Sequence, residues 1–85
     1  MIHEYKIIDT YFEKILSGKK NFEIRLADKE IKEGDELVLK EINSEKEYTG
    51  REIQKKVNYV AKTKDCNHWP QKEIEELGFQ VIGFE

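Results

Sequence analysis

Residues 2–26 read IHEYKIIDTYFEKILSGKKNFEIRL, and this stretch decides the fold. Ile2–Ile8 is apolar and β-branched toward its end, which is typical of a strand. Residues 10–17 carry apolar side chains at helical spacing, and Gly18 then offers the left-handed conformation that ends many helices. Residues 21–26 alternate between apolar and polar side chains. The stretch therefore predicts a strand, a short helix and a second strand.

Side-chain periodicity assigns a face to each of these elements. The first strand has three residues on one face: His3, Tyr5 and Ile7. The spacing of Thr10 and Glu13 predicts a capping box at the start of the helix. The predicted buried stripe of the helix is Tyr11, Phe12, Ile15 and Leu16. In the second strand the predicted core face is Phe22, Ile24 and Leu26, opposite Asn21, Glu23 and Arg25.

The rest of the chain adds three strands and one helix. The Gly34-Asp35 turn precedes them. In order they are a strand over Glu36–Ile42, a hairpin loop over residues 43–47, a strand over residues 53–62, a helix over residues 71–77 and a strand over Phe79–Phe84. On the strand over residues 53–62, parity places four residues on one face: Ile53, Val57, Tyr59 and Ala61. The order β-α-β-β-β-α-β predicts an α+β domain, residues 1–85, with a small, bent or barrel-like sheet of about five strands and two short flanking helices.

Composition excludes several classes of protein. Leu, Ile, Val and Phe contribute 23 of the 85 residues, enough for a single folded core. The formal charge of −3 argues against a protein that coats nucleic acid or membranes by charge alone. The longest apolar run is Leu37-Val38-Leu39, so we expect no membrane span and no signal peptide. With only one cysteine there is no disulfide framework, and we expect a cytoplasmic protein.

The strongest candidate site lies where the helix ends and the second strand begins. Glu23 and Arg25 project from the same strand face, and Lys20 stands at the mouth of that face. A point cation, a planar bidentate donor and a carboxylate together can hold a phosphate and read a base edge or an amide. The alternative interpretation is a solvated strand face with an ordinary Glu–Arg pair.

Two further segments have anion-binding character. Tyr48-Thr49-Gly50-Arg51 sets a glycine beside a hydroxyl and a guanidinium, although it also fits a simple strand entrance. Residues 53–64 hold four lysines and no acid, and Lys56 and Lys62 are predicted to share a polar face. That face would contact phosphates without reading sequence, or it would protect an exposed sheet edge.

The segment Cys66-Asn67-His68-Trp69 is a weak candidate for chemistry. A closed zinc site needs four ligands, and the chain has one thiol and two histidines, so we expect no metal. Cys66 and His68 are poorly placed for a catalytic dyad, because adjacent loop residues seldom orient each other. Trp69 fits a cap over a small core, or a stacking platform if it stands near a cleft. No cofactor-binding fingerprint is present, and we expect no cofactor.

Four ordered motifs resemble the ASCH domain of the PUA-like superfamily, and most closely a short, uncharacterised bacterial and phage ASCH-like subfamily. The motifs are His3-Glu4, Gly18-x-Lys20-x-x-Glu23-x-Arg25, Gly34-Asp35 and Tyr48-Thr49-Gly50-Arg51. The resemblance implies a PUA-like β-barrel, with a cleft between barrel and first helix that takes nucleic acid or a nucleoside. It also implies that Lys20, Glu23 and Arg25 line this cleft and that Arg51 is a neighbour. The chain departs from the subfamily at Leu26-Ala27-Asp28-Lys29, where an Asn-Asp-Arg-like stretch is usual.

Three functions are consistent with these observations. The first is a module that binds single-stranded RNA or a modified nucleoside, with Lys19, Lys20, Glu23, Arg25, Thr49 and Arg51 as binding residues. The second is a small hydrolase of an acylated nucleoside with Lys20 and Glu23 as acid and base, although Glu23 occupies the position where the similar deacylating group has a threonine. The third is an accessory module that binds a protein partner. Binding is favoured over catalysis.

Overall fold

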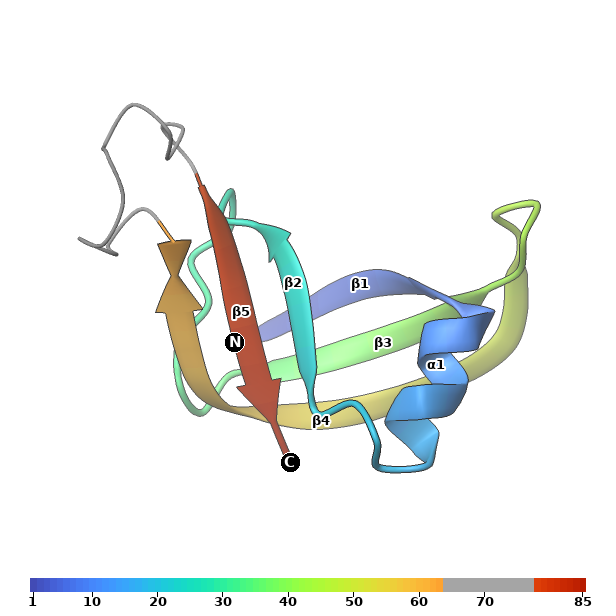
Figure 1. Ribbon diagram of the computed structural model, residues 1–85, viewed down its shortest axis with the longest axis horizontal. Coiled ribbons are helices and arrows are strands. Elements are labelled where there is room, and N and C mark those ends of the chain that lie inside the picture. Colours follow the sequence, from blue (N-terminus) through green and yellow to red (C-terminus); the bar gives the residue numbers. More distant parts are fainter. Residues whose placement is uncertain (64–77) are drawn as a thin grey trace.

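The computed structural model describes residues 1–63 and 78–85. Within these residues the elements are β1 (Ile2–Ile8), α1 (Asp9–Leu16), β2 (Phe22–Leu26), β3 (Glu36–Ile42), β4 (Tyr48–Lys62) and β5 (Phe79–Phe84) (Figure 1). The predicted α+β class and the order of these elements are confirmed. The helix predicted over residues 71–77 lies outside the described residues.

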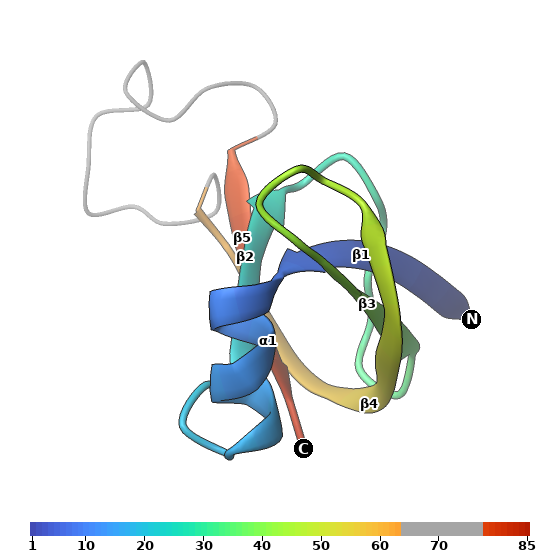
Figure 2. The same cartoon turned by 90° about the vertical axis from the view of Figure 1, so that its right-hand side faces the viewer.

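The strands form one mixed sheet in the order β1-β3-β4-β5-β2. The β1–β3 pair is parallel and the other pairs are antiparallel. β4 is long enough for its first half to pair with β3 and its second half with β5. The sheet curls until its two edge strands, β1 and β2, approach each other (Figure 2), but within the described ranges no ladder joins them. The predicted barrel is therefore not closed.

The core lies inside the curl, and α1 lies across one end of it (Figure 1). Every element except β2 contributes buried apolar residues, and the connection between β2 and β3 contributes one more. They are Tyr5, Ile7, Phe12, Ile15, Ile31, Leu37, Leu39, Val57, Ile82 and Phe84. Two predictions about α1 are wrong. Tyr11 and Leu16 are about half exposed, because a helix of eight residues covers the sheet end with only a narrow stripe. Ile8 is the N-cap residue and has no side-chain cap, and Glu13 pairs with Arg51 instead of closing a capping box.

The two faces of β2 are opposite to the prediction. Glu23 is 7% exposed and Arg25 is half-buried, whereas the apolar face is turned outward, with Phe22 42%, Ile24 55% and Leu26 52% exposed. The reason is charge compensation inside the curl. The Glu23 carboxylate accepts hydrogen bonds from Lys20 and Arg25, so that its burial is not opposed by an unpaired charge.

A bulge in β4 explains a further difference in facing. Where β4 pairs with β5, the register shifts between Val57 and Tyr59, so that Asn58 is the extra residue. An added residue reverses the parity of the strand beyond it: Val57 is buried, and Tyr59, which was predicted to share its face, is 62% exposed. Opposite the bulge, a Cβ on Gly83 would come 2.8 Å from the Asn58 Oδ1 atom, so a larger residue there would require the Asn58 side chain to move.

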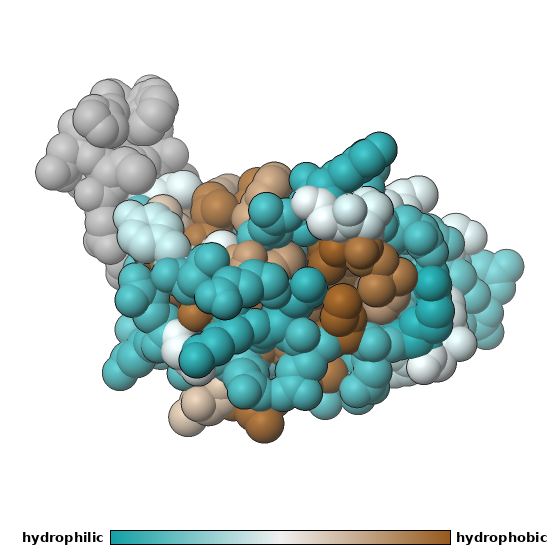
Figure 3. Space-filling view, turned by 90° about the horizontal axis from the view of Figure 1, so that it is seen from below, coloured by the Kyte–Doolittle hydropathy of each residue, from teal (hydrophilic) through white to brown (hydrophobic). Residues whose placement is uncertain are grey.

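Hydrophilic residues cover most of the face seen from below, and hydrophobic residues reach it only in patches (Figure 3). No helix in the described part of the chain is both long enough and apolar enough to span a membrane.

Candidate functional site

Lys20, Glu23 and Arg25 lie in direct contact and form what we call the Glu23 cluster. Glu23 Oε1 accepts a hydrogen bond from Lys20 Nζ at 2.7 Å, and Glu23 Oε2 accepts one from Arg25 Nε at 2.7 Å. The Lys20 and Arg25 side chains are 15% and 29% exposed, so both cations are held at the edge of the core and still reach solvent. With two cations and one carboxylate, the cluster has a net positive charge, which suits an anionic ligand.

The turn after α1 positions Lys20. Gly18 has φ +82°, a left-handed conformation that glycine adopts without strain, and its N–H donates to the Ile15 carbonyl. The N–H groups of Lys19 and Lys20 both donate to the Lys14 carbonyl, so the chain reverses tightly before β2. Lys20 Nζ then donates to the Phe22 carbonyl and lies 5.0 Å from the centre of the Phe22 ring. These contacts hold the ammonium group in one place beside Glu23.

Cationic side chains bridge the two edges of the open sheet. Arg25 Nη2 donates to the Lys6 carbonyl on β1 at 2.5 Å, and the guanidinium lies 4.5 Å from the Tyr5 ring centre. Lys29 Nζ donates to the Glu4 carbonyl at 3.4 Å and lies 4.8 Å from the same ring. Side-chain donors thus form hydrogen bonds with β1 carbonyl groups that, in a closed barrel, would accept hydrogen bonds from backbone N–H groups. The opening between β1 and β2 is consequently a place where cations gather.

A surface hollow of about 350 Å³ lies at this opening, and we call it the β2 hollow. Its lining residues are Tyr5, Ile24, Arg25, Leu26, Asp28, Lys29 and Phe79. Ile24, Leu26 and Phe79 are each more than half exposed, although they are large and apolar. The β2 hollow therefore combines exposed apolar surface, two cations and one carboxylate, which is the mixed lining typical of a ligand site.

Two buried polar atoms near the hollow have no hydrogen-bond partner within the described residues: the Tyr5 hydroxyl and Gln80 Oε1. Burial raises the pKa of the Tyr5 phenol, so the group stays protonated and able to donate. Gln80 is fully buried opposite Arg25, and its Nε2 donates to the Lys29 carbonyl at 3.3 Å. Unsatisfied buried polar groups are uncommon in proteins, and these two lie beside the β2 hollow without opening into it.

A second cluster, the Glu41 cluster, consists of Glu13, Glu41, Thr49 and Arg51. Glu41 is 3% exposed and accepts hydrogen bonds from Thr49 Oγ1 at 2.5 Å and from Arg51 Nε at 2.8 Å and Nη2 at 2.7 Å. Arg51 Nη2 also donates to Glu13 Oε1 on α1 at 2.5 Å. The Arg51 and Thr49 hydrogen bonds lower the pKa of Glu41 to about 2, and the Glu41 contact raises the pKa of Arg51.

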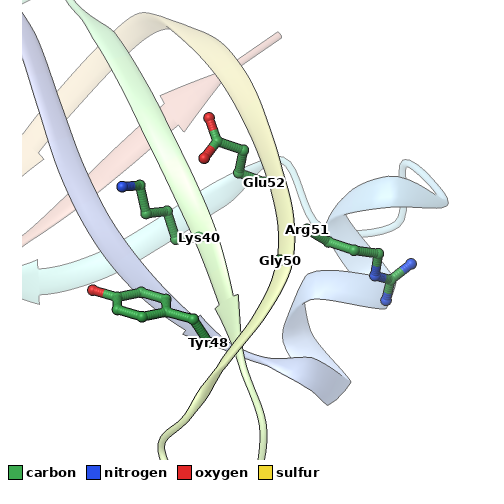
Figure 4. Close-up of a pocket in the computed structure, with 5 residues that line it drawn as sticks. All are labelled: Lys40, Tyr48, Gly50, Arg51 and Glu52. Carbon is green, nitrogen blue, oxygen red and sulfur yellow. The ribbon is translucent and has the colours of Figure 1, made fainter.

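A bulge in β4 makes the Glu41 cluster possible. The pairing jumps from Lys40–Glu52 to Ile42–Tyr48, so Glu41 faces three residues, and Gly50 takes φ +95° between Thr49 and Arg51. Arg51 points toward α1, away from Lys40, Tyr48 and Glu52 (Figure 4). Thr49 and Arg51 were predicted to join Lys20, Glu23 and Arg25, and the structure gives them this separate set of partners instead.

The remaining predicted residues are dispersed. The Lys19 side chain is exposed on the turn after α1. Lys56 and Lys62, predicted to share a face, do not, because the Asn58 bulge reverses the parity between them. Lys62 pairs with Glu30 at 3.2 Å. The segment at residues 66–69 lies outside the described residues, and in the part that is described there is no group of three or more His, Cys, Asp or Glu able to hold a metal ion.

Several residues of these sites were not predicted from the sequence to be site residues, and Tyr5, Glu41 and Phe79 show why. Tyr5 was predicted to share a face with His3 and Ile7; it is buried, and only the curl of the sheet sets it beside Arg25. Glu41 did leave a signal, because it shares the strand parity of Leu37 and Leu39, and a charged residue on a core face is rarely buried without a partner. Phe79 left none, because an apolar residue at a strand end is usually part of the core.

Acid is expected to weaken the fold through two carboxylates. Hydrogen bonds lower the pKa of Glu41 from 4.5 to about 2 and that of Asp35 from 3.8 to about 2, the latter mainly through His3 and then through the Lys32 N–H. The unfolded chain therefore binds these protons at higher pH than the folded chain does. Their stabilising contribution is present above about pH 4.5 and is lost as the pH falls toward 2. The urea midpoint, measured from pH 7 to pH 2, should fall over this interval.

Glu41→Gln should lower the urea midpoint at pH 7 and flatten its fall in acid, because the titrating group is removed while Arg51 loses a charged partner. Glu45→Gln is the matched control, since Glu45 is exposed in the β3–β4 loop. If Glu41→Gln and the unchanged protein lost stability in parallel between pH 5 and pH 2, the assignment of this acid sensitivity to Glu41 would be wrong.

Comparison of the sequence with known proteins shows the family of this chain. Residues 2–73 match the family described as a domain of unknown function, DUF3850. The chain belongs to this family. It is also 36% identical over 82 residues to the uncharacterized 12.9 kDa protein in the GpA 3′ region of Escherichia phage P2, a match that covers 96% of this chain and 70% of the phage protein. DUF3850, rather than the ASCH domain that the motifs resemble, is thus the family shown.

A solved structure has a similar fold. The crystal structure of hypothetical protein PH0355 matches with a TM-score of 0.69, covering 100% of this chain and 98% of that one, at 19% sequence identity. At this identity the likeness concerns the fold alone.

The DUF3850 match contains both clusters and every residue of the β2 hollow except Phe79, so the sites described above lie almost entirely inside the family region.

Proposed function

We propose that this DUF3850 domain binds single-stranded RNA, or a nucleoside from it, at the β2 hollow. The observation that carries the proposal is one juxtaposition: Phe79 is 53% exposed beside Arg25 and Lys29 in the same hollow. A base needs a flat apolar surface on which to stack, and its phosphate needs a cation close by. The hollow offers both within the reach of one nucleotide.

We assign each residue of the hollow a separate role in binding the nucleotide. Arg25 and Lys29 contact phosphate, and Phe79 with its apolar neighbours supports the base. Glu23 orients the Arg25 guanidinium through the Nε hydrogen bond, so the fork is held in place before the ligand arrives. The centre of the Tyr5 ring lies 4.5 Å from the Arg25 guanidinium and 4.8 Å from Lys29 Nζ, and the ring helps to hold both cations at the hollow.

The charge of the chain fits a small, selective contact. The whole protein is net acidic, and Asp28 stands in the hollow with the two cations. Two phosphate contacts predict that the logarithm of RNA affinity falls against the logarithm of salt concentration with a slope of about −1.4. A protein that coats RNA would show a much steeper slope.

Replacing Phe79 with alanine should weaken RNA binding about tenfold, because one stacked base loses its support. The measurement is fluorescence anisotropy of labelled RNA hexanucleotides at low and moderate salt. Tyr59→Ala is the matched control, since Tyr59 is a similarly exposed aromatic residue that does not line the hollow. Its affinity should stay within twofold of the unchanged protein.

Two outcomes would contradict the proposal. In one, the unchanged protein shows no binding to any RNA hexamer at low salt. In the other, Phe79→Ala and Tyr59→Ala weaken binding equally. This would mean that any exposed aromatic residue of the sheet can bind RNA and that the β2 hollow is not the site.

A hydrolase remains the second candidate because Lys20 Nζ, a proton donor, and the Glu23 carboxylate, a proton acceptor, lie 2.7 Å apart at the edge of the core, where both could serve one substrate. Incubation with acylated nucleosides should then release the free nucleoside, and Lys20→Ala should abolish the release. Lys14→Ala, which removes an exposed lysine of α1, is the control. Absence of product across a panel of acylated nucleosides would leave binding as the function.

We also infer that DUF3850 is an ASCH-like group whose PUA-like barrel is open between β1 and β2. Glycines of three resembling motifs support the inference, since Gly18, Gly34 and Gly50 have φ values of +82°, +90° and +95°. These are backbone positions that glycine adopts most readily, so the motifs mark turns and a bulge that build the fold. A crystal structure of the protein with a bound nucleotide would test this together with the site.

A further inference from the structure

We infer that the site takes a strand of several nucleotides, which runs from the β2 hollow across β1 to a second stacking platform at Tyr48. The inference rests on the proposed function and extends it from one base to a polymer. It assigns a role to residues outside both clusters, in particular to Lys6, Lys40 and Tyr48.

Three hollows adjoin one another along the surface. The second, which we call the β1 hollow, measures about 110 Å³ and shares Tyr5 with the β2 hollow; its lining is Glu4, Tyr5, Lys6, Lys40 and Tyr48. The third, the β4 hollow, measures about 240 Å³ and shares Lys40 and Tyr48 with the second; its lining is Lys40, Tyr48, Gly50, Arg51 and Glu52 (Figure 4). The β1 hollow alone is too small for an ordinary small-molecule ligand, because pockets for such ligands have volumes of about 300 Å³ or more. Shallow hollows in series fit an extended chain better.

The chemistry at Tyr48 repeats that of the β2 hollow. The Tyr48 ring is 59% exposed, and the ammonium groups of Lys6 and Lys40 lie 5.6 and 5.9 Å from its centre. An exposed ring held beside two ammonium groups offers a surface on which one base can stack. Lys6 also connects the two places directly, because its carbonyl accepts the hydrogen bond from Arg25.

Two carboxylates set the character of this second platform. Glu4 pairs with Lys40 at 3.2 Å, and Glu52 lines the β4 hollow with it. Two lysines and two glutamates leave no net charge, so affinity there comes from stacking on Tyr48 rather than from attraction to phosphate. The loss of Tyr48 should therefore change affinity without changing its salt dependence.

The experiment compares RNA of two lengths, a uridine monophosphate and a uridine hexamer, by isothermal titration calorimetry. The unchanged protein should bind the hexamer at least tenfold more tightly than the monophosphate. Tyr48→Leu should weaken hexamer binding about tenfold, with the same salt slope, and leave monophosphate binding unchanged. Tyr48→Phe keeps the ring and should bind like the unchanged protein.

The outcomes separate this inference from the proposed function. If Phe79→Ala weakens hexamer binding and Tyr48→Leu does not, the path across β1 is wrong and the β2 hollow stands. If the hexamer binds no more tightly than the monophosphate, the site takes one nucleotide and the inference is overturned. If the unchanged protein binds neither RNA, both fail. Tyr48 is exposed, and equal melting temperatures of the variants would show that the differences arise from binding.

Discussion

Replacing Phe12 with alanine is expected to lower the free energy of unfolding by about 3–5 kcal/mol, the usual cost of a large cavity in a core. Phe12 is 1% exposed and, with Ile15, is one of only two buried residues of α1. Its ring also lies 5.1 Å from the Arg51 guanidinium, so the truncation loosens the helix against the Glu41 cluster as well as against the core. A domain this small has little stability in reserve, so much of the chain should be unfolded at 37 °C.

Tyr11→Ala is the matched control for this prediction, and urea unfolding is the measurement. The neighbouring Tyr11 ring is 51% exposed, so its loss should cost less than about 1 kcal/mol. Equal destabilisation by the two variants would mean that both rings are buried in solution, as the helical spacing alone predicts, and that the narrow contact of α1 is wrong.

Much of the fold can be predicted from local pattern. β1 and β3 have the predicted bounds, because their apolar residues alternate or run together between clear turn signals. Gly18 ends the helix region with the expected left-handed conformation. In these places the local preference and the packing agree, so the sequence alone is enough.

The facing of β2 and β4 could not be predicted from local pattern. Alternation in β2 shows that two faces differ, but it does not show that the polar face turns inward when Lys20 and Arg25 compensate Glu23. In β4, the bulge at Asn58 reverses the parity on which the assignment of Tyr59 depended. Both features are set by contacts between segments far apart in the chain.

The candidate site shows the same division. Lys20, Glu23 and Arg25 are close in sequence: strand parity sets Glu23 and Arg25 on one face, and the turn before β2 brings Lys20 to them. Phe79 is 54 positions from Arg25, and only the pairing of β5 with β2 sets the two in one hollow. Arg51 was expected beside Arg25, and the buried Glu41 holds it elsewhere.

Replacing Arg25 with alanine is expected to weaken binding of RNA hexamers about 100-fold, or about 2.7 kcal/mol. The variant loses a phosphate contact, and it also leaves the Glu23 carboxylate with Lys20 as its one cationic partner among the described residues, so that the cluster becomes neutral. The variant also loses the hydrogen bond from Arg25 to the Lys6 carbonyl, which holds β2 close to β1 beside the hollow. Anisotropy titrations at constant salt measure the effect.

Arg25→Lys separates the charge from the geometry. Lysine keeps the positive charge but cannot donate to Glu23, to Lys6 and to a ligand from one planar group, so affinity should fall about tenfold rather than 100-fold. Lys46→Gln removes a cation from the β3–β4 loop, at the opposite end of the molecule from the β2 hollow (Figure 1), and should leave affinity within twofold. If Arg25→Lys bound like the unchanged protein, Arg25 would act as a charge only, and the ordered fork held by Glu23 would have no part in recognition. If Lys46→Gln weakened binding as much as Arg25→Ala, the contact would be diffuse, and a net-acidic chain would be attracting RNA through scattered lysines rather than through a built site.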